Sequence, residues 1–178
     1  MAITPHGGNL MNRFVPENRK NDLSAEARAL PQIQVDAYAA FDIDCIAKGI
    51  FSPLDGFMGA EAAHRVLETM ELRDGIPWTI PTLLPVAADD AASVESGGKV
   101  AIKDDRGIIV AVMQVTEKFQ LDKHHLVEKV YRTTDEKHPG VAYALSRGDV
   151  YLAGPRDVLE PREVEHQEYN LTPEQTRS

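Results

Sequence analysis

One stretch in the middle of the chain restricts the fold more than any other, because it contains two apolar segments joined by a tight turn. Residues 99–103 alternate between polar and apolar side chains, which is the period of a half-buried β-strand. Residues 104–107, Asp-Asp-Arg-Gly, have the composition of a turn, and residues 108–116 then run back as a long, largely apolar strand. The pattern predicts an antiparallel hairpin, and with it a fold that contains a sheet.

Three segments carry the apolar spacing of helices that could cover such a sheet. Asp36 is the predicted N-cap of the first helix, and Gly49 supplies its stop. A second helix is predicted over residues 60–72, where apolar side chains recur at positions i, i+3, i+4 and i+7. A third helix begins at Asp122, whose carboxylate can accept hydrogen bonds from the first free amides.

The remaining segments give weaker signals. Residues 14–34 are polar and contain two prolines, so we expect a surface connection with at most one short helix, near residues 24–30. Residues 78–86 favour a strand, but two prolines restrict it to an edge or a bulge. A turn is predicted at residues 133–140, and a short strand at residues 150–152. Together these elements predict an α+β domain with a small antiparallel sheet that curls toward a barrel.

Composition narrows the class of protein. A chain of 178 residues with 43% apolar and 26% charged residues is typical of one globular domain. It has no run of roughly 18 apolar residues and no secretory start, so we expect a cytoplasmic protein with no membrane partner. The net charge of −9 and the scattered lysines and arginines argue against a nucleic-acid partner. The single cysteine, Cys45, lies in an apolar stripe and is predicted to be a core residue.

No constellation of residues predicts a catalytic, cofactor or metal site. The glycine pairs at residues 7–8 and 97–98 match neither phosphate-loop pattern, so we interpret them as turns. Three histidines lie in one stretch, at His124, His125 and His138. Because neighbouring side chains on a helix point about 100° apart, a shared metal is not expected.

The last residues contain the start signal of a helix. Residues 172–175, Thr-Pro-Glu-Gln, supply an N-cap hydroxyl, a proline at the first helical position, and a glutamine that can complete a capping box. An isolated helix needs roughly 12 residues to be even marginally stable, and this chain ends at Ser178. A helix that continues in a longer polypeptide explains the signal; a disordered tail with a chance match is the alternative.

Several segments resemble the amino-terminal domains of ATP sulfurylases (sulfate adenylyltransferases). They follow the family pattern in order and spacing: residues 5–8, 46–58, 74–81, 133–141 and 151–155. Residues 171–177, Leu-Thr-Pro-Glu-Gln-Thr-Arg, are similar to the stretch where the family's catalytic domain begins. One departure is Ile50, where many members have a small residue. The resemblance implies an amino-terminal domain over residues 1–168, and a linker or helix over residues 169–178 that leads into a missing catalytic domain.

The resemblance also implies a fold and a reaction. The fold would be a PUA-like β-barrel with flanking helices. The intact enzyme would transfer the adenylyl group of ATP to sulfate, using Mg²⁺ and giving adenosine 5′-phosphosulfate and pyrophosphate. The family's catalytic motifs (Gln-x-Arg-Asn-Pro, His-x-x-His and Gly-Arg-Asp) do not occur in this sequence. We therefore assign no catalytic, cofactor-binding or metal-binding residue, and we expect the chain alone to be inactive.

The partner implied by the resemblance is the catalytic domain of the same enzyme, within a homo-oligomeric parent. Candidate contacts to that domain are His6, Arg13, Phe51 and Phe57. The alternatives are that His6 only caps a turn and that the aromatic rings anchor a loop from inside. The rival function is a free-standing PUA-like module that binds RNA or a protein, and the charge of −9 argues against RNA.

Overall fold

The chain folds into two units, and the backbone passes from one unit to the other several times. In the computed structural model, which describes residues 3–177, unit 1 comprises Met1–Gly56, Gly98–Gln114 and Pro155–Ser178. Unit 2 comprises Phe57–Gly97 and Val115–Gly154. Each unit is described below by itself. The first two residues of the predicted domain and Ser178, the last of the predicted linker, lie outside the described residues.

The sheet of unit 1 contains the predicted hairpin. Strand β4 (Lys99–Lys103) pairs antiparallel with β5 (Ile109–Gln114), and Ala101 lies opposite Val112. The outer neighbour of β4 is β1 (Gln32–Gln34), which runs parallel to it. On the other side, β5 pairs antiparallel with the last residues of β7 (Val150–Val158). The pairings of β4, β5 and β7 are antiparallel, as predicted, and β1 adds a parallel strand that was not predicted.

Strand β7 is also longer than predicted. It has nine residues, whereas the sequence pattern indicated only residues 150–152. Gly154 and Pro155 obscured its second half, since both residues are uncommon inside strands. The first residues of β7 belong to unit 2 and its last residues to unit 1.

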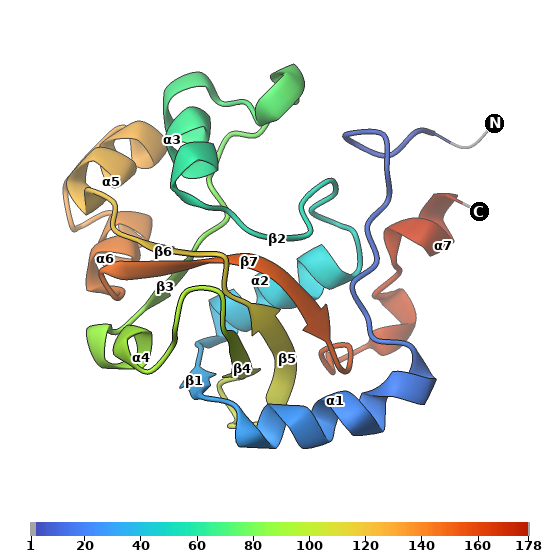
Figure 1. Cartoon of the computed structure of the whole chain (residues 1–178). Coiled ribbons are helices and arrows are strands. Elements are labelled where there is room, and N and C mark those ends of the chain that lie inside the picture. Colours follow the sequence, from blue (N-terminus) through green and yellow to red (C-terminus); the bar gives the residue numbers. More distant parts are fainter. Residues whose placement is uncertain (1–2, 178) are drawn as a thin grey trace. The chain divides into compact units, whose positions relative to one another are not determined.

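Helix α1 (Glu17–Ala29) packs against β4 and β5 in unit 1 (Figure 1). The sequence predicted at most a short helix in this polar segment, and 13 helical residues are observed. Only Leu23 and Ala27 are buried, one turn apart, and they join a core cluster with Ala101 and Val112. Two buried side chains are too few to give a recognisable amphipathic pattern in the sequence. The contacts with the sheet therefore stabilise this helix.

Helix α2 (Ala37–Ala47) confirms the predicted cap and stop. The Asp36 carboxylate accepts from the Ala39 amide at 2.9 Å. Gly49 has a positive φ of 81°, which a glycine adopts without strain. Unit 1 also contains a 3₁₀ turn, η2 (Gln167–Tyr169), and the one-turn helix α7 (Pro173–Arg177).

Unit 2 has two short strands against the first half of β7. They are β3 (Leu84–Val86) and β6 (Glu117–Phe119), and both pair antiparallel with residues 150–153. The strand predicted over residues 78–86 is therefore reduced to its last three residues. The two-residue strand β2 (Gly56–Phe57) was not predicted.

Helices α3 (Ala60–Thr69), α5 (Lys123–Tyr131) and α6 (Pro139–Ser146) form the helical part of unit 2 (Figure 1). They share a core of buried side chains: Leu67, Leu126, Val127 and Val141. Two shorter elements are also present, η1 (Arg73–Gly75) and α4 (Ala88–Ala92).

Two of these helices differ from the sequence-based expectation. Helix α3 was predicted to reach residue 72, but it ends at Thr69 because Met70 adopts a left-handed conformation with φ of 56°. Helix α6 was missed, since its first residues were assigned to a turn. In fact Pro139 occupies the first helical position, where its missing amide costs no hydrogen bond, and the His138 side chain accepts from the Gly140 amide.

The observed fold class is α+β, as predicted. Within residues 3–177, no helix has the length and apolar content needed to cross a bilayer.

Candidate functional site

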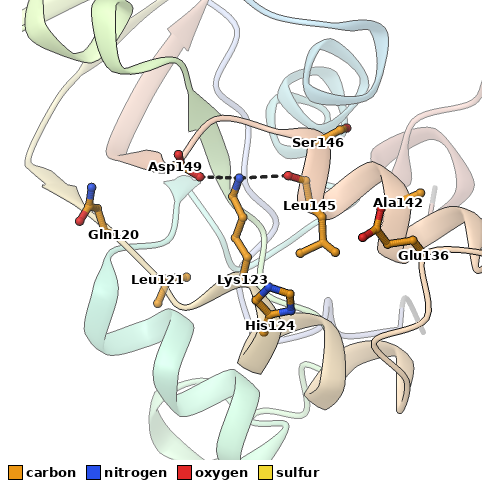
Figure 2. Close-up of a pocket in the computed structure, with 9 residues that line it drawn as sticks. All are labelled: Gln120, Leu121, Lys123, His124, Glu136, Ala142, Leu145, Ser146 and Asp149. Carbon is orange, nitrogen blue, oxygen red and sulfur yellow. Dashed lines mark hydrogen bonds and ion pairs between the residues drawn. The ribbon is translucent and has the colours of Figure 1, made fainter.

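A pocket with a volume of about 720 Å³ lies in unit 2 (Figure 2). It lies where the end of β6 and the start of α5 meet α6 and the residues before β7. Leucine and alanine side chains supply its apolar surface, and charged and polar groups surround them. The lining residues are Gln120, Leu121, Lys123, His124, Glu136, Ala142, Leu145, Ser146 and Asp149.

Lys123 is the cation of this pocket, and it is already bound by the protein. Its ammonium group donates to the carbonyl of Leu145 at 3.3 Å and to the carbonyl of Arg147. It also forms an ion pair with Asp149 at 2.6 Å, and only 13% of its side chain is exposed. Lys123 therefore caps the carboxyl end of α6, where free carbonyls and the helix dipole favour a cation.

The chemistry of this pocket does not suit a polyphosphate or a sulfate ion. Besides the paired lysine, it presents the carboxylates of Glu136 and Asp149. Asp149 and Lys123 neutralise each other, so Glu136 leaves the pocket with a net negative charge that repels an anion. In the part of the chain that the structure describes, no three His, Cys, Asp or Glu residues are grouped so that they could hold a metal ion.

Unit 1 contains a set of buried charges around α2. Arg156 is 1% exposed, and its guanidinium donates to the carbonyl of Asp42 at 3.4 Å. Burial lowers the pKa of Arg156 to about 9, although the nearby Asp42 opposes this shift. Burial likewise raises the pKa of Asp42 to about 6, against the attraction of Arg156. Asp44 and Lys48 form a second buried pair at 2.6 Å.

These buried groups hold separate segments of unit 1 together. The Asp44 carboxylate also accepts from the backbone amide of Arg162 at 3.1 Å, and the Arg162 side chain donates to the carbonyl of Ala37 at 3.0 Å. The segment after β7 is thus fastened to α2. Cys45 is buried, as predicted, and burial raises the pKa of its thiol to about 12, so the thiol stays protonated at neutral pH.

Sequence reasoning missed two cations that the fold holds in place, Arg156 and Lys123. For Arg156 the alternation of buried residues in the second half of β7 was a usable signal, because Arg156 is in phase with the buried Val158. For Lys123 no local signal exists, since its acceptors lie at least 22 residues away.

The four predicted interdomain residues occupy different environments. His6 is exposed and lies in a turn closed by a 2.9 Å hydrogen bond from the Gly8 amide to the Pro5 carbonyl. Phe51 is half-buried, and Phe57 is 4% exposed, which agrees with a ring that anchors a loop from inside.

Arg13 is held within unit 1. Its Nε donates to the carbonyl of Arg156 at 2.8 Å, and a terminal nitrogen forms an ion pair with Asp157 at 2.8 Å. A contact between any of these four residues and a catalytic domain stays a prediction.

The structure does bring two of the sequence segments together. Gly7, in the amino-terminal turn, lies so close to Pro53 that an added Cβ would come within 2.6 Å of the proline ring. Nearby, the Met11 amide donates to the buried Ser52 hydroxyl at 3.0 Å. The residues around His6 and the residues after Phe51 are therefore neighbours in unit 1, although more than 40 positions separate them in the sequence.

Comparison with known proteins agrees with this fold. The family described as "PUA-like domain" matches residues 3–161, so the chain belongs to the PUA-like domain family. The hexameric APS kinase from Thiobacillus denitrificans has a similar fold, with a TM-score of 0.75 and 24% identity. That match covers 98% of this chain and 30% of the other.

Similar curated proteins define the type of PUA-like domain. The sulfate adenylyltransferase of Synechococcus sp. (strain JA-3-3Ab) is 44% identical over 159 residues, which are 89% of this chain and 40% of the relative. The sulfate adenylyltransferase of Hyperthermus butylicus is 40% identical over 177 residues, which are 99% of this chain and 45% of the relative. The chain is thus a PUA-like domain of the ATP sulfurylase type, and it spans less than half the length of these relatives.

Proposed function

We propose that this chain is the non-catalytic, amino-terminal scaffold domain of a sulfate adenylyltransferase. One observation carries the proposal. The chain matches such enzymes over most of its own length but over only 30–45% of theirs. In keeping with this, the pocket of unit 2 does not suit their anionic substrates. The reaction of the intact enzyme would then be catalysed by the part of the relatives that lies outside the match.

The physical reason lies in the charge that the reaction develops. A sulfate oxygen attacks the α-phosphorus of ATP while pyrophosphate leaves, and negative charge is spread over the phosphate oxygens. Catalysis of such a transfer requires clustered cations and amide donors held in place. In this chain several of the lysines and arginines already serve as structural donors. Arg13 binds Asp157, Lys123 caps α6, and Lys118 donates to the carbonyls of Ala91 and Val94.

We assign the Mg²⁺ ion of the reaction to the catalytic part. It prefers oxygen ligands from carboxylates together with substrate phosphates. Among residues 3–177 no three His, Cys, Asp or Glu residues are grouped so that they could hold a metal ion by themselves. ATP and Mg²⁺ would then be bound by the catalytic part, and this chain would support the orientation of that part.

A cytoplasmic, homo-oligomeric parent enzyme belongs to the same proposal. The single cysteine is buried and forms no disulfide, which fits a reducing compartment. Size-exclusion chromatography with light scattering would test the oligomeric state.

An activity assay tests the main proposal. The purified chain is incubated with ATP, sulfate, Mg²⁺ and inorganic pyrophosphatase, and phosphate release is measured with and without sulfate. The complete Synechococcus sulfate adenylyltransferase serves as the positive control. We expect no sulfate-dependent phosphate from the chain alone. Sulfate-dependent release at a rate near that of the control would overturn the proposal, because the chain would then contain its own catalytic site.

A further inference from the structure

The segment after β7 carries two large apolar side chains that face solvent. Tyr169 is 80% exposed and Leu171 is 53% exposed. Tyr169 is the last residue of η2, and Leu171 lies between η2 and α7 of unit 1, in a segment that we call the arm (residues 164–177). Single exposed apolar residues are common on proteins, whereas neighbouring ones together form the kind of apolar surface that a partner can cover.

The arm has a defined local structure, so these side chains are held in position. The Tyr169 amide donates to the His166 carbonyl at 3.0 Å, and the Asn170 amide donates to the Gln167 carbonyl at 3.1 Å. The rings of His166 and Tyr169 are tilted against each other, with centroids 6.3 Å apart. Tyr169 is therefore presented by an ordered turn.

Helix α7 fixes the second side chain. Its predicted capping box is present: the Thr172 amide donates to the Gln175 side chain at 2.8 Å, and the Gln175 amide donates to the Thr172 hydroxyl at 3.2 Å. Leu171 directly precedes this N-cap, where an apolar residue commonly packs against the fourth residue of the helix. Here that residue is the polar Thr176, so α7 does not supply the usual apolar partner at this position.

The relatives indicate what covers these side chains. The Hyperthermus butylicus sulfate adenylyltransferase aligns over 177 residues of this chain, which include the arm, and more than half of its own length lies outside the match. We propose that Tyr169 and Leu171 form a docking surface covered by that remaining part of a sulfate adenylyltransferase polypeptide. This inference rests on the proposed function, because it requires that the chain works joined to a catalytic part.

The test uses a complete polypeptide. The matched residues of the Hyperthermus enzyme are replaced by this chain, and the chimera is compared with the chain alone by tyrosine nitration with tetranitromethane. Mass spectrometry measures the nitration rate of Tyr169, and free N-acetyltyrosine amide reports the reagent dose. In an active chimera we expect Tyr169 to react at least tenfold more slowly than in the chain alone, since a contact would exclude the reagent.

The outcomes separate the two proposals. An active chimera in which Tyr169 reacts as fast as in the chain alone overturns the docking surface and leaves the proposed function standing. A chimera without sulfate-dependent activity counts against the proposed function, and the docking surface falls with it.

Matched variants give a second measurement. The Tyr169→Ser/Leu171→Ser pair should lower the melting temperature of the chimera by several degrees and leave that of the chain alone unchanged. Ile108→Ser, which alters a similarly exposed apolar side chain (51%) of unit 1, should change neither. Equal effects of the paired variant on both proteins would contradict the docking surface.

Discussion

The hairpin turn of unit 1 depends on one buried carboxylate, that of Asp104, which is 3% exposed. One of its oxygens accepts from the backbone amides of Arg106 at 3.0 Å and Ile108 at 2.9 Å. The other oxygen accepts from the Arg106 guanidinium at 2.9 Å. Asp104→Ala removes all three acceptor contacts without changing the backbone, so it measures how much this carboxylate stabilises the hairpin.

The expected magnitude follows from these three bonds. A hydrogen bond to a charged group contributes about 1.5–3 kcal/mol when it is shielded from water, and about 1 kcal/mol when water can replace it. Arg106 and Ile108 are both exposed, so water can reach their donors after the substitution. We therefore expect Asp104→Ala, which loses three bonds, to lower the free energy of unfolding by about 3 kcal/mol, and Asp104→Asn, which keeps the acceptor for the two amides, by about 1 kcal/mol.

Urea denaturation followed by circular dichroism at pH 7 measures both changes, and Asp105→Ala is the matched control. Asp105 is the exposed neighbour, so its replacement should change the stability by less than about 0.5 kcal/mol. If Asp104→Ala is no more destabilising than Asp105→Ala, the reasoning about the turn is refuted.

The same carboxylate predicts a dependence on pH. Burial alone would raise the pKa of Asp104, but the hydrogen bonds from Ile108 and Arg106 outweigh it and lower the pKa below the ordinary 3.8. A group whose pKa is lower in the folded state stabilises the protein above its unfolded pKa, and this stabilisation is lost as the pH falls through the folded value. The stability difference between wild type and Asp104→Ala should therefore be constant above pH 5 and shrink below pH 4.

Three further predictions concern other parts of the chain. Asp122→Ala removes the N-cap that accepts from the amides of His124 and His125, and it should cost about 1 kcal/mol in urea denaturation, with Asp122→Asn close to wild type. Leu152→Ala leaves a cavity at a fully buried position and should cost about 3 kcal/mol in the same assay; a loss below about 1 kcal/mol would contradict its burial. Cys45 should not react with Ellman's reagent in the native protein at pH 8 but should react fully in urea, because burial raises the pKa of its thiol to about 12.

Local signals were sufficient for part of the fold. The hairpin was predictable because alternation, turn residues and a returning apolar run coincide within 18 residues. The caps of α2 and α5 were predictable because an aspartate accepts from amides two or three residues later. The capping box at Thr172 was predictable for the same reason.

Elements that depend on distant partners were not predictable. Strand β1 has three residues and is defined by its pairing with β4, almost 70 positions away. Helix α1 has only two buried side chains and requires the sheet beneath it. Helix α6 was not predicted, because its first residues, Pro139 and Gly140, are typical of turns. In the structure the His138 side chain caps this helix by accepting from the Gly140 amide.

The pocket in unit 2 illustrates the same limit. The residues that line it lie between positions 120 and 149, and no local pattern in that stretch predicts a cavity. By contrast, the absence of the family's catalytic motifs is a direct property of the sequence, so the expectation of an inactive chain did not depend on the fold.

In this acidic chain the ammonium groups of Lys118 and Lys123 have a structural role. Each ammonium group fastens the carboxyl end of a helix, α4 in one case and α6 in the other, through backbone carbonyls. Acetylation would remove the charge and leave a single N–H donor on each side chain. A lysine-acylating agent should therefore destabilise the carboxyl ends of α4 and α6 while the apolar cores stay intact. Modification of these two amines would thus weaken the fold locally.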